Sequence, residues 1–267
     1  MAALFSNTSR MSNQDLNTQS TLTRCMHNRI EAVQNAILNA CQTAQRPIEQ
    51  VQLLAVTKTH PFETIRTAYS LGLRAFGENY VQEGVDKVIA FRIAEPDNHV
   101  VWHFIGPLQS NKTRVVAEHF DWVHGVDRLK IAQRLSEQRP INASPLNVLI
   151  QVNISAEASK SGCTPESVLA LAQQVVLLPR LKLRGLMTIP AAIDPTADEA
   201  SQRLPFIALA KLHADLKAQL ADEHAEVFDT LSMGMSDDFP HAIAAGATLI
   251  RIGSALFGTR PTKPSHS

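Results

Sequence analysis

The chain has 267 residues, of which 45% are hydrophobic and 19% charged, so it can bury a sizeable core and global disorder is excluded. Lys and Arg number 25, as do Asp and Glu, and this balance indicates neither a nucleic-acid-binding protein nor an acidic tail. Three irregularly spaced cysteines form no metal motif or disulfide framework, which is typical of the cytoplasm. No apolar run is long enough to cross a bilayer, so we expect no membrane span.

The N-terminal part of the chain is expected to hold a tail and one helix. Residues 1–20 are polar, rich in Asn, Ser and Thr, and lack the apolar segment of a secretory signal. We therefore expect a flexible tail over 1–20 and a domain over 21–267. Apolar residues recur at helical spacing over 22–45, which predicts an extra helix before the first strand.

From residue 51 onward, short apolar segments alternate with helical patterns. Strands are expected at 51–57, 74–77, 100–105, 122–126, 147–153, 183–189, 230–233 and 248–252, and helices at 61–71, 81–92, 127–137, 165–178, 198–220 and 238–245. This alternation predicts α/β architecture with a parallel sheet, and eight repeats match a single (β/α)8 TIM barrel. An open doubly wound sheet is the alternative, which the lack of a Gly-x-Gly-x-x-Gly turn after any strand disfavours.

Lys58 stands at the end of the first expected strand. The segment 51–57 reads as a strand buried on both faces, and Pro61 blocks its continuation. A lysine there can place its amine at the rim where barrel enzymes carry their sites. An amine partly removed from water has a lowered pKa and can attack an aldehyde. The alternative is a solvated lysine that only follows a strand.

The loops after the last two strands could form a phosphate site. Ser236 lies in the loop before the helix at 238–245, and Gly253 and Ser254 follow the eighth strand. Barrels of this kind commonly bind phosphate at these two loops, through backbone amides and hydroxyls. Taken alone, Ser236 could be a helix N-cap and Gly253 a turn residue.

Other polar residues follow the same strands. Asn79 could cap a helix or contact a ligand, Arg251 could join a surface ion pair, and His103 is expected to be a hydrogen-bonded core residue. Strands one and eight are neighbours in a closed barrel, so an amine would face the anion site. A compound with both an aldehyde and a phosphate would bridge them, and pyridoxal 5′-phosphate (PLP) is such a compound.

Seven segments of the chain resemble the PLP homeostasis protein family, a set of cytoplasmic PLP-binding proteins that share the barrel of the alanine racemase N-terminal domain. They are AVTKTHP (55–61), FGENYVQE (76–83), HFIGPLQSNK (103–112), QVNISAEASKSG (151–162), LRGLMTIP (183–190), LSMGMSDDF (231–239) and RIGSALFG (251–258). They occur in the family's order, and the resemblance covers about residues 22–258.

The resemblance implies roles for the candidate residues. Lys58 would form the internal aldimine with PLP, and Arg251 would meet the pyridine nitrogen. Ser236 and the amides of Gly253 and Ser254 would bind the phosphate. Asn79 would lie beside the cofactor. A guanidinium cannot accept a proton, so an arginine at the pyridine nitrogen weakens PLP as an electron sink and disfavours strong carbanion chemistry.

These features predict a PLP-binding protein of intracellular PLP homeostasis, which carries no catalytic or metal-binding residue and holds PLP as an aldimine on Lys58. We expect a monomer, with PLP-dependent enzymes as candidate client partners. A PLP-dependent racemase is one alternative, but its second base comes from a C-terminal β-domain in alanine racemase, and this chain ends nine residues after Gly258 with only Tyr69 and Tyr80 as tyrosines. A barrel that binds sugar phosphates through a Schiff base is the other, for which Arg251 has no obvious partner.

Overall fold

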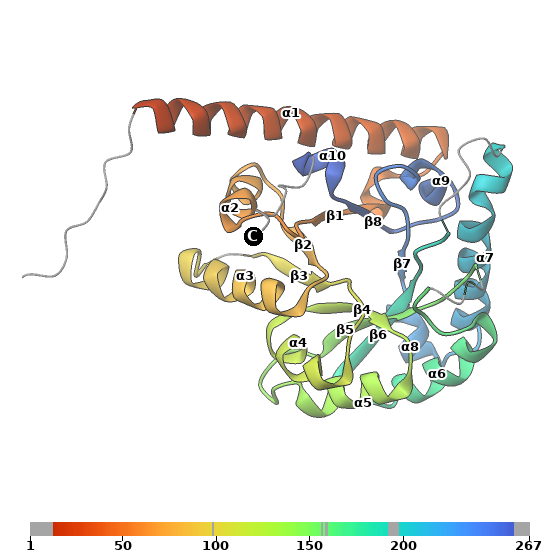
Figure 1. Ribbon diagram of the computed structural model, residues 1–267. Helices are drawn as coiled ribbons and strands as arrows, with labels where there is room; N and C mark the ends of the chain where they lie inside the picture. The colour runs from red at the N-terminus through yellow and green to blue at the C-terminus, as the bar shows by residue number, and fades with distance from the viewer. Residues whose placement is uncertain (1–12, 98, 156, 158–159, 192–197, 259–267) are drawn as a thin grey trace, which may run out of the picture.

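A computed structural model describes residues 13–97, 99–155, 157, 160–191 and 198–258. Eight parallel strands close into a barrel in chain order, which confirms the predicted (β/α)8 architecture (Figure 1). The strands are β1 Gln52–Val56, β2 Ala75–Glu78, β3 Val101–Phe104, β4 Trp122–Val126, β5 Leu146–Gln151, β6 Leu181–Met187, β7 Thr230–Ser232 and β8 Leu249–Ile252. Because all are parallel, their carboxyl ends meet at one rim.

Helices cover the outside of the barrel. They are α1 Asn13–Thr43, α2 Phe62–Ser70, α3 Val81–Ala94, α4 Thr113–His119, α5 Leu129–Gln138, α6 Val168–Val175, α7 Glu199–Lys217, α8 Asp222–Val227, α9 Phe239–Ala244 and α10 Ser254–Phe257, with 3-10 turns η1 Ile48–Gln50, η2 Ser110–Lys112 and η3 Pro165–Ser167. The sequence patterns missed α4, α8 and α10, which have seven, six and four residues, although they predicted α9, which has six.

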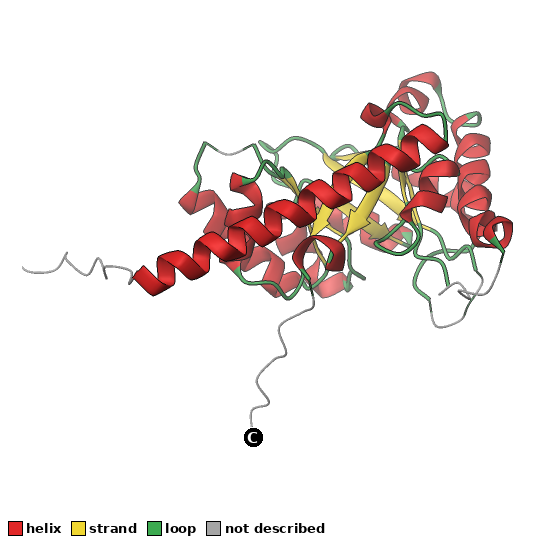
Figure 2. Cartoon of the chain, turned by 90° about the horizontal axis from the view of Figure 1, so that it is seen from above, coloured by secondary structure: helices red, strands yellow, loops and turns green. Residues whose placement is uncertain are grey.

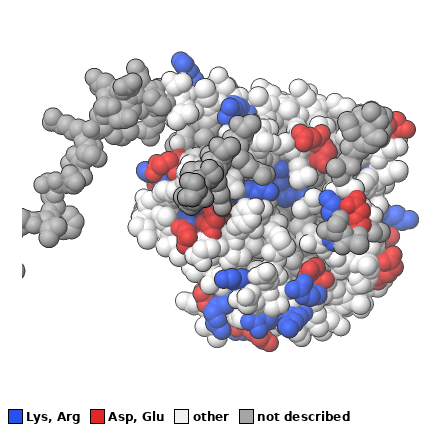
Figure 3. Space-filling model, viewed as in Figure 1, with Lys and Arg blue, Asp and Glu red and all other residues white. Residues whose placement is uncertain are grey.

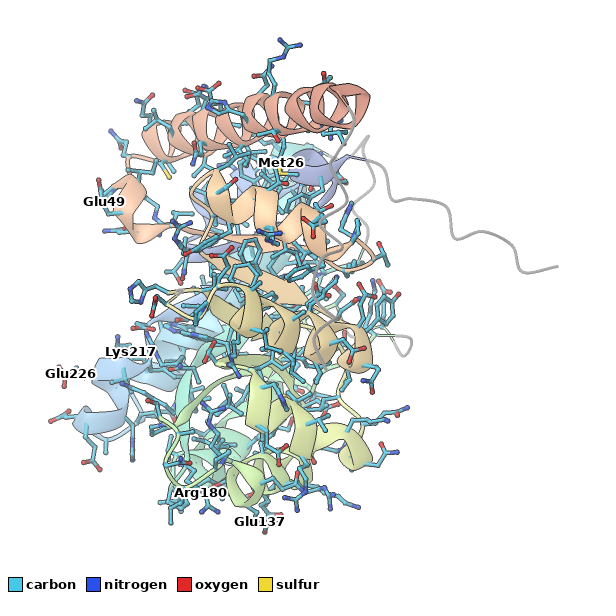
Figure 4. All side chains as sticks on the ribbon, turned by 90° about the vertical axis from the view of Figure 1, so that its left-hand side faces the viewer. Met26, Glu49, Glu137, Arg180, Lys217 and Glu226 are labelled. Atoms are coloured by element: carbon cyan, nitrogen blue, oxygen red, sulfur yellow. The ribbon has the colours of Figure 1, made fainter. Side chains whose placement is uncertain are left out.

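The N-terminal helix is longer than predicted. It begins at Asn13, so residues 13–20 of the expected flexible tail are helical, while residues 1–12 lie outside the described residues. Its buried face consists of Ile30, Val33, Ile37 and Cys41, at steps of three or four residues. This face packs on α9 and α10, and α1 lies across the barrel when seen from above (Figure 2). Met26 points from α1 toward the barrel (Figure 4).

The first strand is buried on both faces, as predicted. Leu54 joins Ala75 and Leu249 in a small apolar cluster, whereas the next residue, Ala55, belongs to the large core that also contains Phe76. This alternation follows the two-residue period of a strand. In register, Leu54 pairs with Arg251 of β8 and Ala55 pairs with Phe76 of β2. The end of β1 is therefore fixed between β2 and β8.

Acidic and basic side chains are interspersed over the face shown in Figure 3, and the basic ones gather most on the side formed by α4 and α5. In the described part of the chain, no helix is both long and apolar enough to span a membrane.

Candidate functional site

A cavity of about 550 Å³ opens at the rim formed by the strand ends. It is within the size range of small-molecule sites. All six residues predicted to bind the cofactor line it: Lys58, Asn79, Ser236, Arg251, Gly253 and Ser254. They come from the ends of β1, β2, β7 and β8, which are distant in sequence and adjacent in the closed barrel. The structure therefore brings the predicted set together in one place.

Lys58 lies in a turn immediately after β1. The turn closes through a hydrogen bond from the His60 amide to the Thr57 carbonyl at 3.0 Å. Lys58 is half-buried and its side chain lines the cavity, so the side chain is not an ordinary solvated strand-end lysine. Thr59, the next residue, has φ 67°, a left-handed conformation that is unusual for a β-branched side chain.

Arg251 is buried on β8 and is held by two hydrogen bonds. Its Nη1 donates to Ser232 Oγ at 2.8 Å, and its Nη2 donates to the Thr188 carbonyl at 2.9 Å. Burial lowers the pKa of Arg251 to about 10, and the nearby Asp238 carboxylate opposes that shift. The guanidinium is still charged at neutral pH, because a pKa of about 10 lies well above pH 7. The alternative of a surface ion pair is thus wrong for this residue.

A chain of buried polar groups continues behind Arg251. Ser232 Oγ lies 3.0 Å from His124 Nδ1, and His124 Nε2 lies 2.9 Å from His103 Nδ1. Burial lowers the pKa of His103 to about 3 and moves that of His124 well below its usual value, so both rings are neutral at physiological pH. The prediction that His103 is a hydrogen-bonded core histidine is confirmed.

Ser236 and Ser254 lie side by side in the lining of the cavity. Their hydroxyl oxygens are 3.3 Å apart. The N-cap of α9 is Asp238, whose carboxylate accepts a hydrogen bond from the Met235 amide at 2.6 Å. Ser236 is therefore not the cap of that helix, and its hydroxyl can serve a ligand.

Gly253 lies close against the end of β1. A Cβ added at this position would lie 3.3 Å from the carbonyl oxygen of Val56, which is closer than most real Cβ contacts. Glycine lets the end of β8 approach the end of β1, and this approach brings Ser254 and Lys58 to the same cavity.

Asn79 follows β2 and presents a polar atom without a protein partner. The N-cap of α3 is Tyr80, so Asn79 is not that helix's cap. Its Oδ1 is buried and has no hydrogen-bond partner among the residues that the structure describes. Buried polar atoms are nearly always paired, so this oxygen fits a hydroxyl or amide donor on a bound ligand. The wall is completed by apolar groups, including Ile105, Pro107 and Ile189.

Sequence reasoning missed His60, which lines the cavity and packs its ring against Phe257 with centroids 5.2 Å apart. Thr188 and Ser232 hold Arg251 from the ends of β6 and β7. Their positions at strand ends mark them as rim residues, but no local pattern shows that both face the same arginine.

The chain matches the family model described as alanine racemase, N-terminal domain, over residues 30–261. It is 56% identical over 231 residues to the pyridoxal phosphate homeostasis protein of Vibrio alginolyticus, covering 86% of this chain and 96% of the relative. The protein of that name from Escherichia coli (strain K12) is 51% identical over 234 residues, covering 88% and 96%.

Solved structures show the same fold. PipY of Synechococcus elongatus with PLP bound is 35% identical with a TM-score of 0.71, covering 87% of this chain and 100% of PipY. An alanine racemase from Corynebacterium glutamicum, at 15% identity and a TM-score of 0.59, covers 88% of this chain and 62% of the racemase, and it supports the barrel fold alone. The matches to the two pyridoxal phosphate homeostasis proteins cover most of this chain and most of each relative. The chain therefore belongs to the pyridoxal phosphate homeostasis protein family.

Proposed function

We propose that this protein binds PLP for intracellular PLP homeostasis and holds the cofactor through Lys58. The observation that carries the proposal is the convergence of an amine, a buried guanidinium and two serine hydroxyls on one cavity of suitable size. The names of relatives more than 50% identical to this chain, and the PLP-bound PipY structure, support the same ligand.

When bound, PLP supplies an aldehyde carbon that condenses reversibly with a lysine amine. In this chain Lys58 is the amine at the cavity. Ser236, Ser254 and the Gly253 amide would bind the phosphate. Asn79 Oδ1, which is buried without a partner in the described structure, offers an acceptor to a polar group beside the ring.

Arg251 limits what this site can do. Its Nη1 and Nη2 donate to Ser232 and Thr188, so the guanidinium is held rigidly in the barrel wall. Guanidinium groups donate hydrogen bonds and accept none. A ring nitrogen placed against Arg251 would therefore not be protonated, and substrate carbanions would gain little stabilisation. This geometry supports reversible carriage of PLP over transamination or decarboxylation.

Racemisation would also need an acid or base on each side of the cofactor. Tyr69 packs edge-on against Phe91 outside the barrel, with centroids 5.2 Å apart, and Tyr80 is 53% exposed. Neither tyrosine is among the described residues that line the cavity. A sugar phosphate is the second candidate ligand, but it offers Arg251 no ring nitrogen. We further propose that the chain is a single barrel domain over 21–267, acts as a monomer in the cytoplasm, and supplies PLP to client enzymes.

The test is PLP titration of the purified protein followed by ultraviolet and visible absorbance. We expect one PLP per chain with the absorbance of PLP attached to a lysine amine, and borohydride reduction should fix the cofactor on the peptide that contains Lys58. Lys58→Ala should lose both signals, whereas Lys112→Ala, a change at an exposed lysine on η2, should keep them. Unchanged spectrum and stoichiometry in Lys58→Ala would refute the assignment. Rapid exchange of the α-proton of alanine in D2O would favour a racemase.

A further inference from the structure

A second lysine, Lys87 of α3, lies buried behind the turn that carries Lys58. It is 8% exposed and uses all three donors of its ammonium group. Nζ donates to the Thr57 carbonyl at 2.8 Å, to Glu78 Oε1 at 2.8 Å and to Glu83 Oε1 at 2.6 Å. All three donors of Lys87 are thus engaged by the protein, and Lys87 is not among the described residues that line the cavity, so it serves as a structural contact and not as a second lysine for the ligand.

The two residues that flank Lys58 are tied to this group. On one side, Thr57 donates its hydroxyl to Glu78 Oε1 at 2.6 Å and accepts from Lys87 through its carbonyl. On the other side, the Thr59 amide donates to Glu83 Oε1 at 2.5 Å. Lys58 is therefore the centre of a three-residue segment whose two ends are both fixed by side chains of β2 and α3.

The conformation of Thr59 shows why the segment needs these contacts. A β-branched residue at φ 67° is strained, and such residues persist only where the surroundings hold them. The Glu83 carboxylate accepts the amide of this residue, and Lys87 in turn binds the same carboxylate oxygen. Without these contacts the turn could relax to an ordinary conformation, which would re-aim the preceding side chain.

Glu78 is the buried member of the group. It is fully buried at the end of β2, and its Oε1 receives hydrogen bonds from both Thr57 and Lys87. Burial raises the pKa of the Glu78 carboxyl, and the Lys87 ammonium opposes that shift. A buried carboxylate and ammonium cost free energy to desolvate, so replacing them by apolar residues is often neutral or stabilising. Their presence beside the Lys58 turn points to a role other than packing.

We propose that Lys87 and Glu83, with Glu78, are positioning residues that hold the Lys58 amine at the cavity for covalent capture of PLP. The proposal rests on the proposed function, because it assigns Lys58 as the residue that binds the aldehyde. Neither Lys87 nor Glu83 is among the described residues that line the cavity, so they act through the turn and not by touching the ligand.

The test compares two ligands that differ at the reacting carbon. PLP carries an aldehyde, whereas pyridoxine 5′-phosphate carries an alcohol there and cannot condense with an amine. We expect Lys87→Met to weaken PLP binding about tenfold or more and to slow its covalent attachment, as expected for loss of hydrogen bonds to a charged group. Affinity for pyridoxine 5′-phosphate should stay within about twofold of the parent, because the anion site is untouched.

Arg180→Met is the matched control. Arg180 is also a cation that donates to the main chain, in its case to the carbonyls of Ser136 at 2.6 Å and Glu137 at 3.0 Å. Figure 4 places it at the end of the molecule opposite α1. Removing this cation should leave the affinities for both ligands unchanged. Equal weakening of the two ligands by Lys87→Met would show general damage and overturn the positioning role.

Changes at two further residues keep the inference testable if Lys87→Met does not fold. Glu83 is partly exposed, with 30% of its side chain accessible. Glu83→Ala should weaken PLP selectively, and Glu83→Gln should restore most of the loss because an amide oxygen can still accept from Thr59. Thr59→Gly, which relieves the left-handed strain, should reduce the effect of Glu83→Ala.

The outcomes separate this inference from the proposed function. If the parent protein binds PLP through Lys58 but Glu83→Ala and any folded Lys87→Met bind PLP like the parent, only the positioning role is wrong. If Lys58→Ala retains the parent spectrum, the proposed function itself is wrong.

Discussion

The contrast between two buried arginines yields a quantitative prediction. Arg251 faces the cavity, whereas Arg139 follows α5 and donates to the carbonyls of Ala117 at 2.6 Å, Phe120 at 2.7 Å and Ser144 at 2.9 Å. Both are buried cations in one fold. We expect Arg251→Met to change the free energy of unfolding far less than Arg139→Met, when both are measured without PLP.

The magnitude for Arg251 follows from two opposing effects. A pKa lowered from 12.5 to about 10 means that burial disfavours the charged form by about 3 kcal/mol. Its hydrogen bonds to Ser232 and Thr188 together contribute about 4 kcal/mol, at about 2 kcal/mol for each bond to a charged donor. Methionine removes both effects and keeps much of the apolar contact. The net loss should therefore be about 1 kcal/mol.

Arg139→Met removes three hydrogen bonds, worth about 6 kcal/mol at the same value of about 2 kcal/mol for each bond. Burial also lowers the pKa of Arg139, so the net loss should be smaller than that sum but larger than the loss for Arg251→Met. Urea unfolding followed by circular dichroism would measure both variants, with the slope of the transition as a check that each remains two-state. A loss for Arg251→Met as large as that for Arg139→Met would refute the reasoning, because it would mean that the cavity arginine is held for stability. The absorbance of bound PLP should nevertheless change in Arg251→Met.

Two further predictions concern the buried histidines and the cavity wall. Burial lowers the pKa of His103 to about 3, so the ring stabilises the fold while neutral and this stability is lost as pH falls below about 6.5, where the unfolded chain binds the proton. Between about pH 7 and about pH 5, His103 should account for a loss of about 2 kcal/mol in the free energy of unfolding. His103→Gln should remove this part of the pH dependence, and an unaltered dependence of the free energy of unfolding on pH would contradict the prediction. Gly106→Ala should weaken PLP binding about tenfold or more, because the new Cβ would lie 2.2 Å from the Asn79 carbonyl oxygen. A PLP titration that gave the parent affinity would contradict this prediction, because it would mean that the main chain at Asn79 can move away from the new Cβ.

The strands could be predicted from sequence because each is a short apolar segment with a clear end. For β1 the expected range 51–57 contains the observed Gln52–Val56, and the same holds for β8, expected at 248–252 and observed at Leu249–Ile252. The shortest helix, α10, was missed for the opposite reason. The four residues of α10 complete barely one turn, so no periodicity exists to detect.

The candidate site was predictable to the extent that it depends on strand ends. Lys58, Arg251 and Ser236 each lie at the end of a strand or in the loop that follows, and closure of the barrel brings those ends together. The contacts that hold these side chains in place were not predictable from the sequence. His124 and Ser232 are 108 residues apart, and their contact depends on side-chain directions inside the barrel. Thr59 gave no signal either, since glycine or asparagine normally marks a left-handed turn position.

The two lysines near β1 illustrate what the structure adds. By residue type Lys58 and Lys87 are equivalent, and burial alone would point to Lys87, whose side chain is further removed from water. Hydrogen bonding reverses that choice: Lys87 places its three donors on Thr57, Glu78 and Glu83, while Lys58 reaches the cavity from the turn that those contacts hold. Lys87 therefore holds the turn from behind, and Lys58 is the one of the two lysines that a ligand in the cavity can reach.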